Sequence, residues 1–139
     1  MSDISLARTE LVALLTPIAS VRTGRAALET TSATLPVITL WSTSDVPATD
    51  QGYAAPAYTR TVLLEYKAAA SATYDADLDA VLRRIRLAIK PPIGGPPLDH
   101  ALAIRETAVR FFAPDITQNS GDIAVMQITL EIDYLERLL

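Results

Sequence analysis

The chain has no cysteine and a single histidine among its 139 residues. Without cysteine it can form no disulfide, no thiolate metal site and no cysteine nucleophile. Histidine is the commonest general base, but His100 follows a proline-rich segment, and the chain has no Gly-x-Ser-x-Gly elbow to supply a serine nucleophile. We therefore expect His100 to be a surface residue of a loop. We also expect the protein to be neither an enzyme nor a cofactor-binding protein.

A surplus of positive charge is also missing. Twelve basic and sixteen acidic residues give a net charge of −4 and a pI of about 4.9, which argues against a dedicated nucleic-acid binder. No segment approaches the roughly 20 apolar residues needed to span a bilayer, and the first residues lack the features of a signal peptide. We expect a protein that is made and folded in a cytoplasm, with no membrane partner.

Two groups of carboxylates deserve a test as metal or catalytic sites. Asp75, Asp77 and Asp79 resemble the start of a calcium loop, but alanine stands at its sixth position and arginine at its twelfth, where an EF-hand needs glycine and glutamate. Acidic residues also suit the first turn of a helix, which is the reading we prefer. Glu131 and Asp133 share one face of a strand, and we expect that face to be solvated. The sequence thus predicts no metal site and no catalytic residue.

Half of the chain is hydrophobic and a fifth is charged, enough to build a core. Its length predicts one domain over residues 1–139. Hydrophobic periodicity and breaking residues predict two helices and five strands. The helices are expected at 2–16 and 75–90, and the strands at 20–23, 35–41, 57–67, 102–114 and 123–134. We expect an α+β fold: a mostly antiparallel sheet with two helices packed on one face and a long C-terminal strand hairpin.

The C-terminal hairpin is the most informative feature. Each of its strands is about twice the common length of roughly 5–6 residues, and a polar turn joins them. Alternate residues of the last strand form an entirely apolar face: Ala124, Met126, Ile128, Leu130, Ile132 and Tyr134. The other face begins with Ile123 and Val125 and then becomes polar. Phe111 and Phe112 point to opposite faces near the turn, so the hairpin is apolar on both sides there and on one side farther away.

An apolar patch on an open sheet face usually marks a partner site. We infer that another chain covers the half of the hairpin near its turn. The alternative is that the long segment 42–56, predicted as a loop, folds back over it. Such long loops are usually functional or disordered.

Aromatic residues are few, and three lie in or beside segment 42–56. Trp41, Tyr53 and Tyr58 are candidates for interface anchors, although Trp41 and Tyr58 also fit a core. The candidate interface residues are Trp41, Tyr53, Tyr58, Phe111, Phe112, Ile123 and Val125.

The order of elements resembles the tail terminator proteins of long-tailed bacteriophages, over nearly the whole chain. The matching pieces are small and structural, and lie in every part of the sequence. They are the N-terminal helix, Val21-x-x-Gly24-Arg25, Leu35-Pro36-Val37-Ile38, the strand TRTVLLEY with Arg60, the helix with Leu78-Asp79, and the final strand–turn–strand with Gly121 in its turn.

The resemblance implies a six-membered ring of α+β subunits that caps the tail tube. Such a ring stops tube polymerisation and offers a surface to head-completion or neck proteins, while DNA passes through its lumen without specific binding. It implies a virion protein at the head-proximal end of the tail, assembled in the host cytoplasm, without a cofactor. The alternatives are another neck or head–tail connector ring component, a small ligand-binding α+β domain, and an enzyme that uses buried carboxylates.

Overall fold

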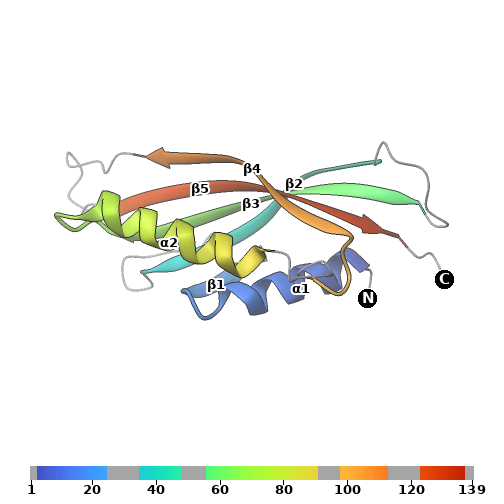
Figure 1. Cartoon of the computed structure of the whole chain (residues 1–139), viewed down its shortest axis with the longest axis horizontal. Helices are drawn as coiled ribbons and strands as arrows, with labels where there is room; N and C mark the ends of the chain where they lie inside the picture. Colours follow the sequence, from blue (N-terminus) through green and yellow to red (C-terminus); the bar gives the residue numbers. More distant parts are fainter. Residues whose placement is uncertain (1–2, 25–34, 48–55, 91–97, 113–122, 137–139) are drawn as a thin grey trace.

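The structure is a computed structural model that describes residues 3–24, 35–47, 56–90, 98–112 and 123–136. Its five strands form one sheet in the order β1-β2-β3-β5-β4, in which only β1 and β2 are parallel. Both helices lie on the same side of this sheet (Figure 1). The predicted α+β class is therefore confirmed. The elements are α1 (Asp3–Leu15), β1 (Ser20–Thr23), β2 (Val37–Pro47), β3 (Ala57–Ala69), α2 (Tyr74–Ile89), β4 (Ala103–Phe112) and β5 (Ile123–Leu135).

Both helices bury an apolar stripe against the sheet, because their apolar residues recur every three or four positions. Helix α1 ends two residues before Pro17, which disfavours helical geometry in the residue before it. Asp75 and Asp77 occupy the first turn of α2, where the helix dipole favours negative charge. No helix among the described residues is long and apolar enough to cross a membrane. The buried residues are Ile4, Ala7, Leu11 and Leu15 in α1, and Leu78, Leu82, Ile85 and Ile89 in α2.

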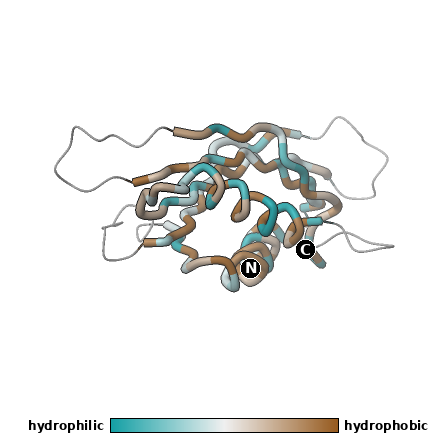
Figure 2. Tube along the Cα trace, turned by 60° about the vertical axis from the view of Figure 1, so that its left-hand side comes forward, coloured by the Kyte–Doolittle hydropathy of each residue, from teal (hydrophilic) through white to brown (hydrophobic). Residues whose placement is uncertain are grey.

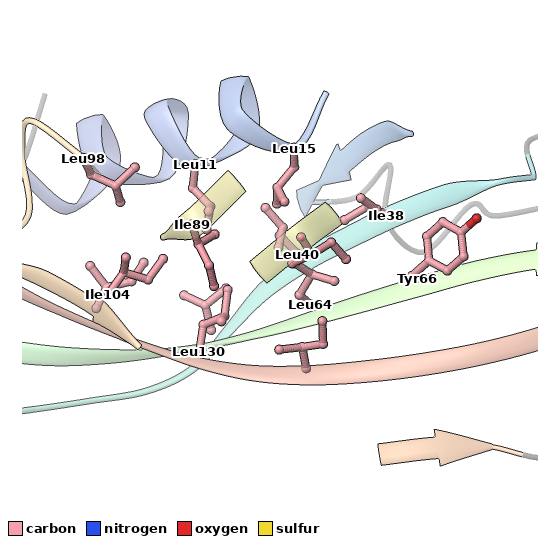
Figure 3. Packing of buried hydrophobic residues seen from close by; sticks show 14 of the residues in the cluster. Leu11, Leu15, Ile38, Leu40, Leu64, Tyr66, Ile89, Leu98, Ile104 and Leu130 are labelled. Carbon is pink, nitrogen blue, oxygen red and sulfur yellow. The ribbon is translucent and has the colours of Figure 1, made fainter. Parts of the chain in front are cut away.

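Strands β3 and β5 form the centre of the sheet and pair over their full length, from Ala57 opposite Leu135 to Ala69 opposite Ile123. The predicted apolar face of β5 is fully buried under the helices. Figure 3 shows Leu11 and Leu15 of α1 and Ile89 of α2 lying over the sheet residues that they cover. Alternation along β5 thus assigns one face to the core and leaves the other, the open face, without a helix.

The prediction for segment 42–56 was wrong in its first part. Residues 42–47 continue β2 and pair with β3 up to Pro47 opposite Tyr58, past an irregularity between Ser42 and Ser44. Because β3 offers its backbone groups over this whole length, pairing outweighs the weak strand propensity of this Ser- and Asp-containing stretch. The extension runs toward the end of the sheet opposite the β4–β5 connection (Figure 1). These six residues therefore do not cover the hairpin turn, and residues 48–55 lie outside the described part.

The C-terminal hairpin forms as predicted, with β4 antiparallel to β5 and a register shift between Glu106 and Ala108. Phe111 stands opposite Met126 on the helix-covered face, and Phe112 stands opposite Val125 on the open face. The prediction that the two phenylalanines point to opposite faces is therefore confirmed. The connection, residues 113–122, lies outside the described part of the chain and includes the predicted turn.

Candidate assembly surface

The hairpin divides into two halves with different surroundings. We call residues 109–112 and 123–126 the turn half, and residues 103–106 and 130–135 the far half. In the turn half Phe111 is 51% exposed and Phe112 is 37% exposed. In Figure 2 the trace is hydrophobic on both strands where the 113–122 connection begins and ends. The turn half thus carries two large apolar side chains, Phe111 and Phe112, that are adjacent on β4 and exposed.

On the open face of the turn half, three apolar residues lie together. Phe112 is paired with Val125, and Ile123 follows on the same side of β5. Both β5 residues are half-buried. The Arg110 guanidinium lies 5.3 Å from the Phe112 ring centre, a cation–π contact worth about 0.5–1 kcal/mol at an exposed site. The structure therefore brings three of the predicted interface residues into one patch.

Phe111 lies on the opposite face, beside the core rather than inside it. Its neighbour two positions back, Val109, packs against the core cluster, but Phe111 keeps half of its surface exposed. Across the sheet on this face stand Met126 and then Tyr66, which are both buried. Phe111 thus projects at the margin of the helix-covered layer.

The far half carries its charges in pairs. Arg105 donates to Glu131 at 2.6 Å and to Asp133 at 2.5 Å, and Thr59 donates to Asp133 at 2.6 Å. Burial alone raises the pKa of Asp133, but the hydrogen bonds from Arg105 and Thr59 outweigh it and hold that pKa below its usual value of 3.8. The prediction that Glu131 and Asp133 share a face is confirmed, and both form ion pairs with Arg105 there.

The predicted aromatic anchors beside segment 42–56 are separated. Trp41 is 39% exposed, stands opposite Leu63 two strands away from the Phe112 patch, and also lines a hollow between α1 and the sheet. Tyr58 lies on the helix-covered face, where it packs against the core and stacks on Tyr134 with 5.9 Å between ring centres. The core interpretation of Tyr58 therefore fits the structure better. Tyr53 lies outside the described residues.

A buried tyrosine joins an ion pair at the end of the sheet near Pro47. Arg60 donates to Asp45 at 2.8 Å, and the Tyr134 hydroxyl donates to the same carboxylate. Burial and the hydrogen bond to Asp45 raise the pKa of Tyr134 to about 12. A sequence signal did exist, because Arg60 is the one charge on the otherwise apolar face of β3. Its partner Asp45 was missed because residues 42–47 had been assigned to a loop.

A second feature that sequence reasoning missed is a hollow between α1 and the sheet, which we call the α1 hollow. Its volume is about 460 Å³. Val12, Leu40 and Val62 supply apolar lining, while Thr9 and the exposed Arg8 line it from α1. Helical spacing places Arg8, Thr9 and Val12 near one another, but the sequence does not show how closely α1 approaches β2 and β3.

The remaining candidates have structural contacts. Asp77 accepts a hydrogen bond from Ser71 at 2.8 Å at the start of α2, and among the described residues no group of three or more acidic or histidine side chains is arranged to hold a metal. His100 is half-buried, and its Nδ1 bonds to Glu10 of α1, which also accepts from the Asp99 amide. His100 therefore ties its segment to α1, a contact beyond the predicted surface-loop role.

Comparison of the sequence with known proteins finds no match, either among family models or among curated proteins. Within the described part of the chain, the turn half of the hairpin and the α1 hollow are the surface features that suggest a function.

Proposed function

We propose that this chain is the subunit of a ring that terminates the tail of a long-tailed bacteriophage. In this role it caps the tail tube, stops further polymerisation and presents a surface to head-completion or neck proteins. The observation that carries the proposal is the exposed turn half, with Phe111 and Phe112 on opposite faces of one strand end. Apolar clusters of this kind mark protein–protein contacts. The order of elements, which resembles tail terminators, is the second support.

Ring closure requires two different patches on each subunit, because neighbours in a ring meet head to tail. The elongated sheet offers such patches at separate places: the turn half lies at one end, and the extended β2–β3 pair reaches the other (Figure 1). A short β1 of four residues also leaves the second half of β2 without a partner on its outer side among the described strands. A monomer with such ends is suited to repeat contacts with copies of itself.

The open face is suited to a lumen through which DNA moves. Its described charges are three carboxylates (Glu65, Glu131, Asp133) and four cations (Arg22, Lys67, Arg105, Arg110). Lys67 and Arg105 already hold carboxylates, at 3.0 Å from Glu65 and 2.6 Å from Glu131. Phosphate binding depends on cations that are free to replace counterions. A ring wall of this composition would bind DNA only weakly.

The α1 hollow favours one competing function, a small ligand-binding domain, because its volume falls in the usual range for ligand sites of about 300–1,000 Å³. Another neck or head–tail connector ring remains the alternative within the same setting. The tail terminator, the ligand-binding domain and the connector ring are expected to differ in mass and in binding partners.

The test is native mass spectrometry of the purified chain at high concentration, followed by electron microscopy with purified tail tubes. We expect a species of six times the 15.0 kDa subunit mass that binds tube ends. A ring that does not bind tube ends but binds head particles would indicate a connector instead. A persistent 15.0 kDa monomer that takes up a small ligand would contradict the ring altogether.

A further inference from the structure

We propose that β4 of one subunit pairs with β2 of the next subunit, so that the sheets of neighbouring subunits join edge to edge. This inference rests on the proposed ring, and it adds which two surfaces meet in it. The paired segments are residues 108–112, which we call the β4 edge, and residues 41–46, which we call the β2 edge. Each edge is therefore covered by a second copy of this chain.

Both edges lack a partner strand on their outer side among the described strands. The order of the sheet puts β4 at one side, where it pairs only with β5. At the other side β1 pairs with β2 only from Val37 to Leu40, so the β2 edge has no described strand outside it. Such an edge presents backbone N–H and C=O groups that an added strand can satisfy.

The strand directions make the two edges complementary. Strand β2 is antiparallel to β3, β3 to β5 and β5 to β4, so β4 runs opposite to β2. A second copy placed beside the first in the same orientation therefore brings its β2 next to β4 as an antiparallel pair. The alternation of strand directions continues from one subunit into the next.

Exposed apolar side chains gather on these two edges. Five large apolar side chains are exposed in the described part of the chain, and four of them lie here: Trp41 and Val46 on the β2 edge, and Phe111 and Phe112 on the β4 edge. The fifth is Leu87 on α2. An apolar edge strand that is left open in a monomer tends to pair with another strand, so these edges are suited to an assembly contact.

The rest of both strands is closed to such pairing. Glu106 of β4 forms an ion pair with α2, and the register shifts between Glu106 and Ala108. Charges and irregularities of this kind protect a sheet edge. Within the two edges the charged residues are Arg110 on one and Asp45 on the other, so the contact opposes no like charges.

One register pairs all five residues of the β4 edge with the β2 edge and keeps each face of the sheet continuous. The ladder puts Trp41, Ser44 and Val46 on the same side as Phe112, with a shift between Ser42 and Ser44. In this register Phe112 stands opposite Trp41, and Ala108 stands opposite Val46. An aromatic pair directly across two strands stabilises their pairing.

The stagger of this register suits a closed ring. Within one subunit Phe112 is level with Val125, Lys67 and Val37, so standing opposite Trp41 displaces the next copy by four residues. That is about 13 Å along the strands, while the four strands of each step span about 19 Å across the sheet. The resulting strand tilt is about 35°, at the lower end of the roughly 35–45° at which sheets close into barrels.

The test is disulfide cross-linking, because the chain has no cysteine of its own. Val46→Cys and Ala108→Cys are combined in one chain, which keeps both Trp41 and Phe112. Residues directly opposite in an antiparallel pair have Cα atoms about 4.5–5.5 Å apart, within reach of a disulfide. Inside one subunit the two positions are three strand spacings apart, at least about 14 Å, so only a bond between copies can form.

Two control pairs use the same oxidation. Ser42→Cys with Ala108→Cys lies about 10 Å out of register and changes a single atom at Ser42. Val46→Cys with Leu87→Cys replaces the β4 position by an exposed residue of α2. All the positions are exposed or half-buried, so each variant should fold, as circular dichroism will check.

We expect the Val46–Ala108 variant to give cross-linked species up to six times the 15.0 kDa subunit mass, which a reductant converts to single subunits. Both control pairs should form the ring without cross-links. Cross-linked open chains of varied length that do not bind tube ends would support the edge contact and contradict the tail-terminating ring.

Four results would overturn the inference. Rings that form without Val46–Ala108 cross-links would leave the proposed function standing with a different contact. Equal cross-linking in the control pairs would indicate random collisions, and cross-linking of chains that carry only one of the two cysteines would indicate a symmetric contact between like edges. A wild-type chain that stays monomeric at all concentrations would remove the proposed function and this contact together.

Discussion

The two halves of the C-terminal hairpin use the same two strands and the same ladder, yet their surfaces are opposite in kind. In the far half the open face holds Arg105 between Glu131 and Asp133, and the covered face is buried under helices. In the turn half Phe111 is exposed on the helix-covered face and Phe112 on the open face. The far half therefore has its charges paired and its apolar face covered within one subunit, whereas the turn half leaves large apolar side chains exposed, and we propose that a neighbouring chain covers them.

The largest expected effect separates the buried and exposed positions of the hairpin. Leu130→Asp places an unpaired charge where the side chain is fully buried, and we expect it to remove the folded state, at a cost of several kcal/mol. Phe112→Asp changes an exposed position, and we expect the free energy of unfolding of the subunit to fall by only about 1 kcal/mol, largely through loss of the cation–π contact with Arg110. Urea unfolding followed by circular dichroism measures both.

The same pair of variants also tests the contrast directly. If Phe112→Asp unfolded the subunit as Leu130→Asp does, the turn half would belong to the monomer core, and the distinction between the halves would fail. A folded Phe112→Asp subunit supports the distinction.

The sequence predicted the far half well and the turn half only in outline. Alternation along β5 assigned each of its residues to the correct face, because a strand has only two faces. It also placed Phe111 and Phe112 on opposite faces. It did not show that Phe111, although on the covered face, lies at the margin of the helix layer, because that depends on where α2 sits over the sheet.

Long-range contacts explain what the sequence did not predict. Residues 42–47 look like a loop by composition, and only pairing with β3 makes them a strand. The Arg60–Asp45–Tyr134 cluster depends on that pairing, since Asp45 stands opposite Arg60 only in this register. The α1 hollow depends on how α1 packs over β2 and β3, which no local pattern records. The resemblance to tail terminators implied only α+β subunits and indicated no individual interface residue.

A smaller effect is expected at the buried end of the far half. Tyr134→Phe removes the hydroxyl that donates to Asp45, and we expect a loss of about 1 kcal/mol at neutral pH. The wild type itself should lose stability as the pH rises from 10 to 12, by roughly 2–3 kcal/mol at most relative to neutral pH. The sign follows because the pKa of Tyr134 is raised to about 12 in the folded state from its ordinary 10, so the unfolded chain releases its proton first.

The variant lacks this titration, so its stability should fall less over the same interval. Tyrosinate absorbance during alkaline titration provides a second measurement, in which the slowest-ionising component of the wild type should disappear from the variant. An unchanged titration curve would contradict the assignment of that component to Tyr134.

The smallest expected effect concerns the paired charges that make the far half self-sufficient. Arg105→Met removes the cation but keeps much of the side chain's apolar stem, and we expect a loss of up to about 1 kcal/mol at pH 7, because the pair is partly exposed. The pKa of Asp133 lies below 3.8 in the folded state, so its stabilisation is present above that value and disappears as the pH falls through the folded pKa. Wild type and variant should therefore differ in free energy of unfolding at neutral pH and become equal in acid, as urea unfolding across pH 2–7 will measure.

The mass of the proposed ring should be unchanged in Arg105→Met, because these charges are satisfied within the subunit. An Arg105→Met chain that folds but no longer assembles would place the far half in the interface and end the contrast between the halves.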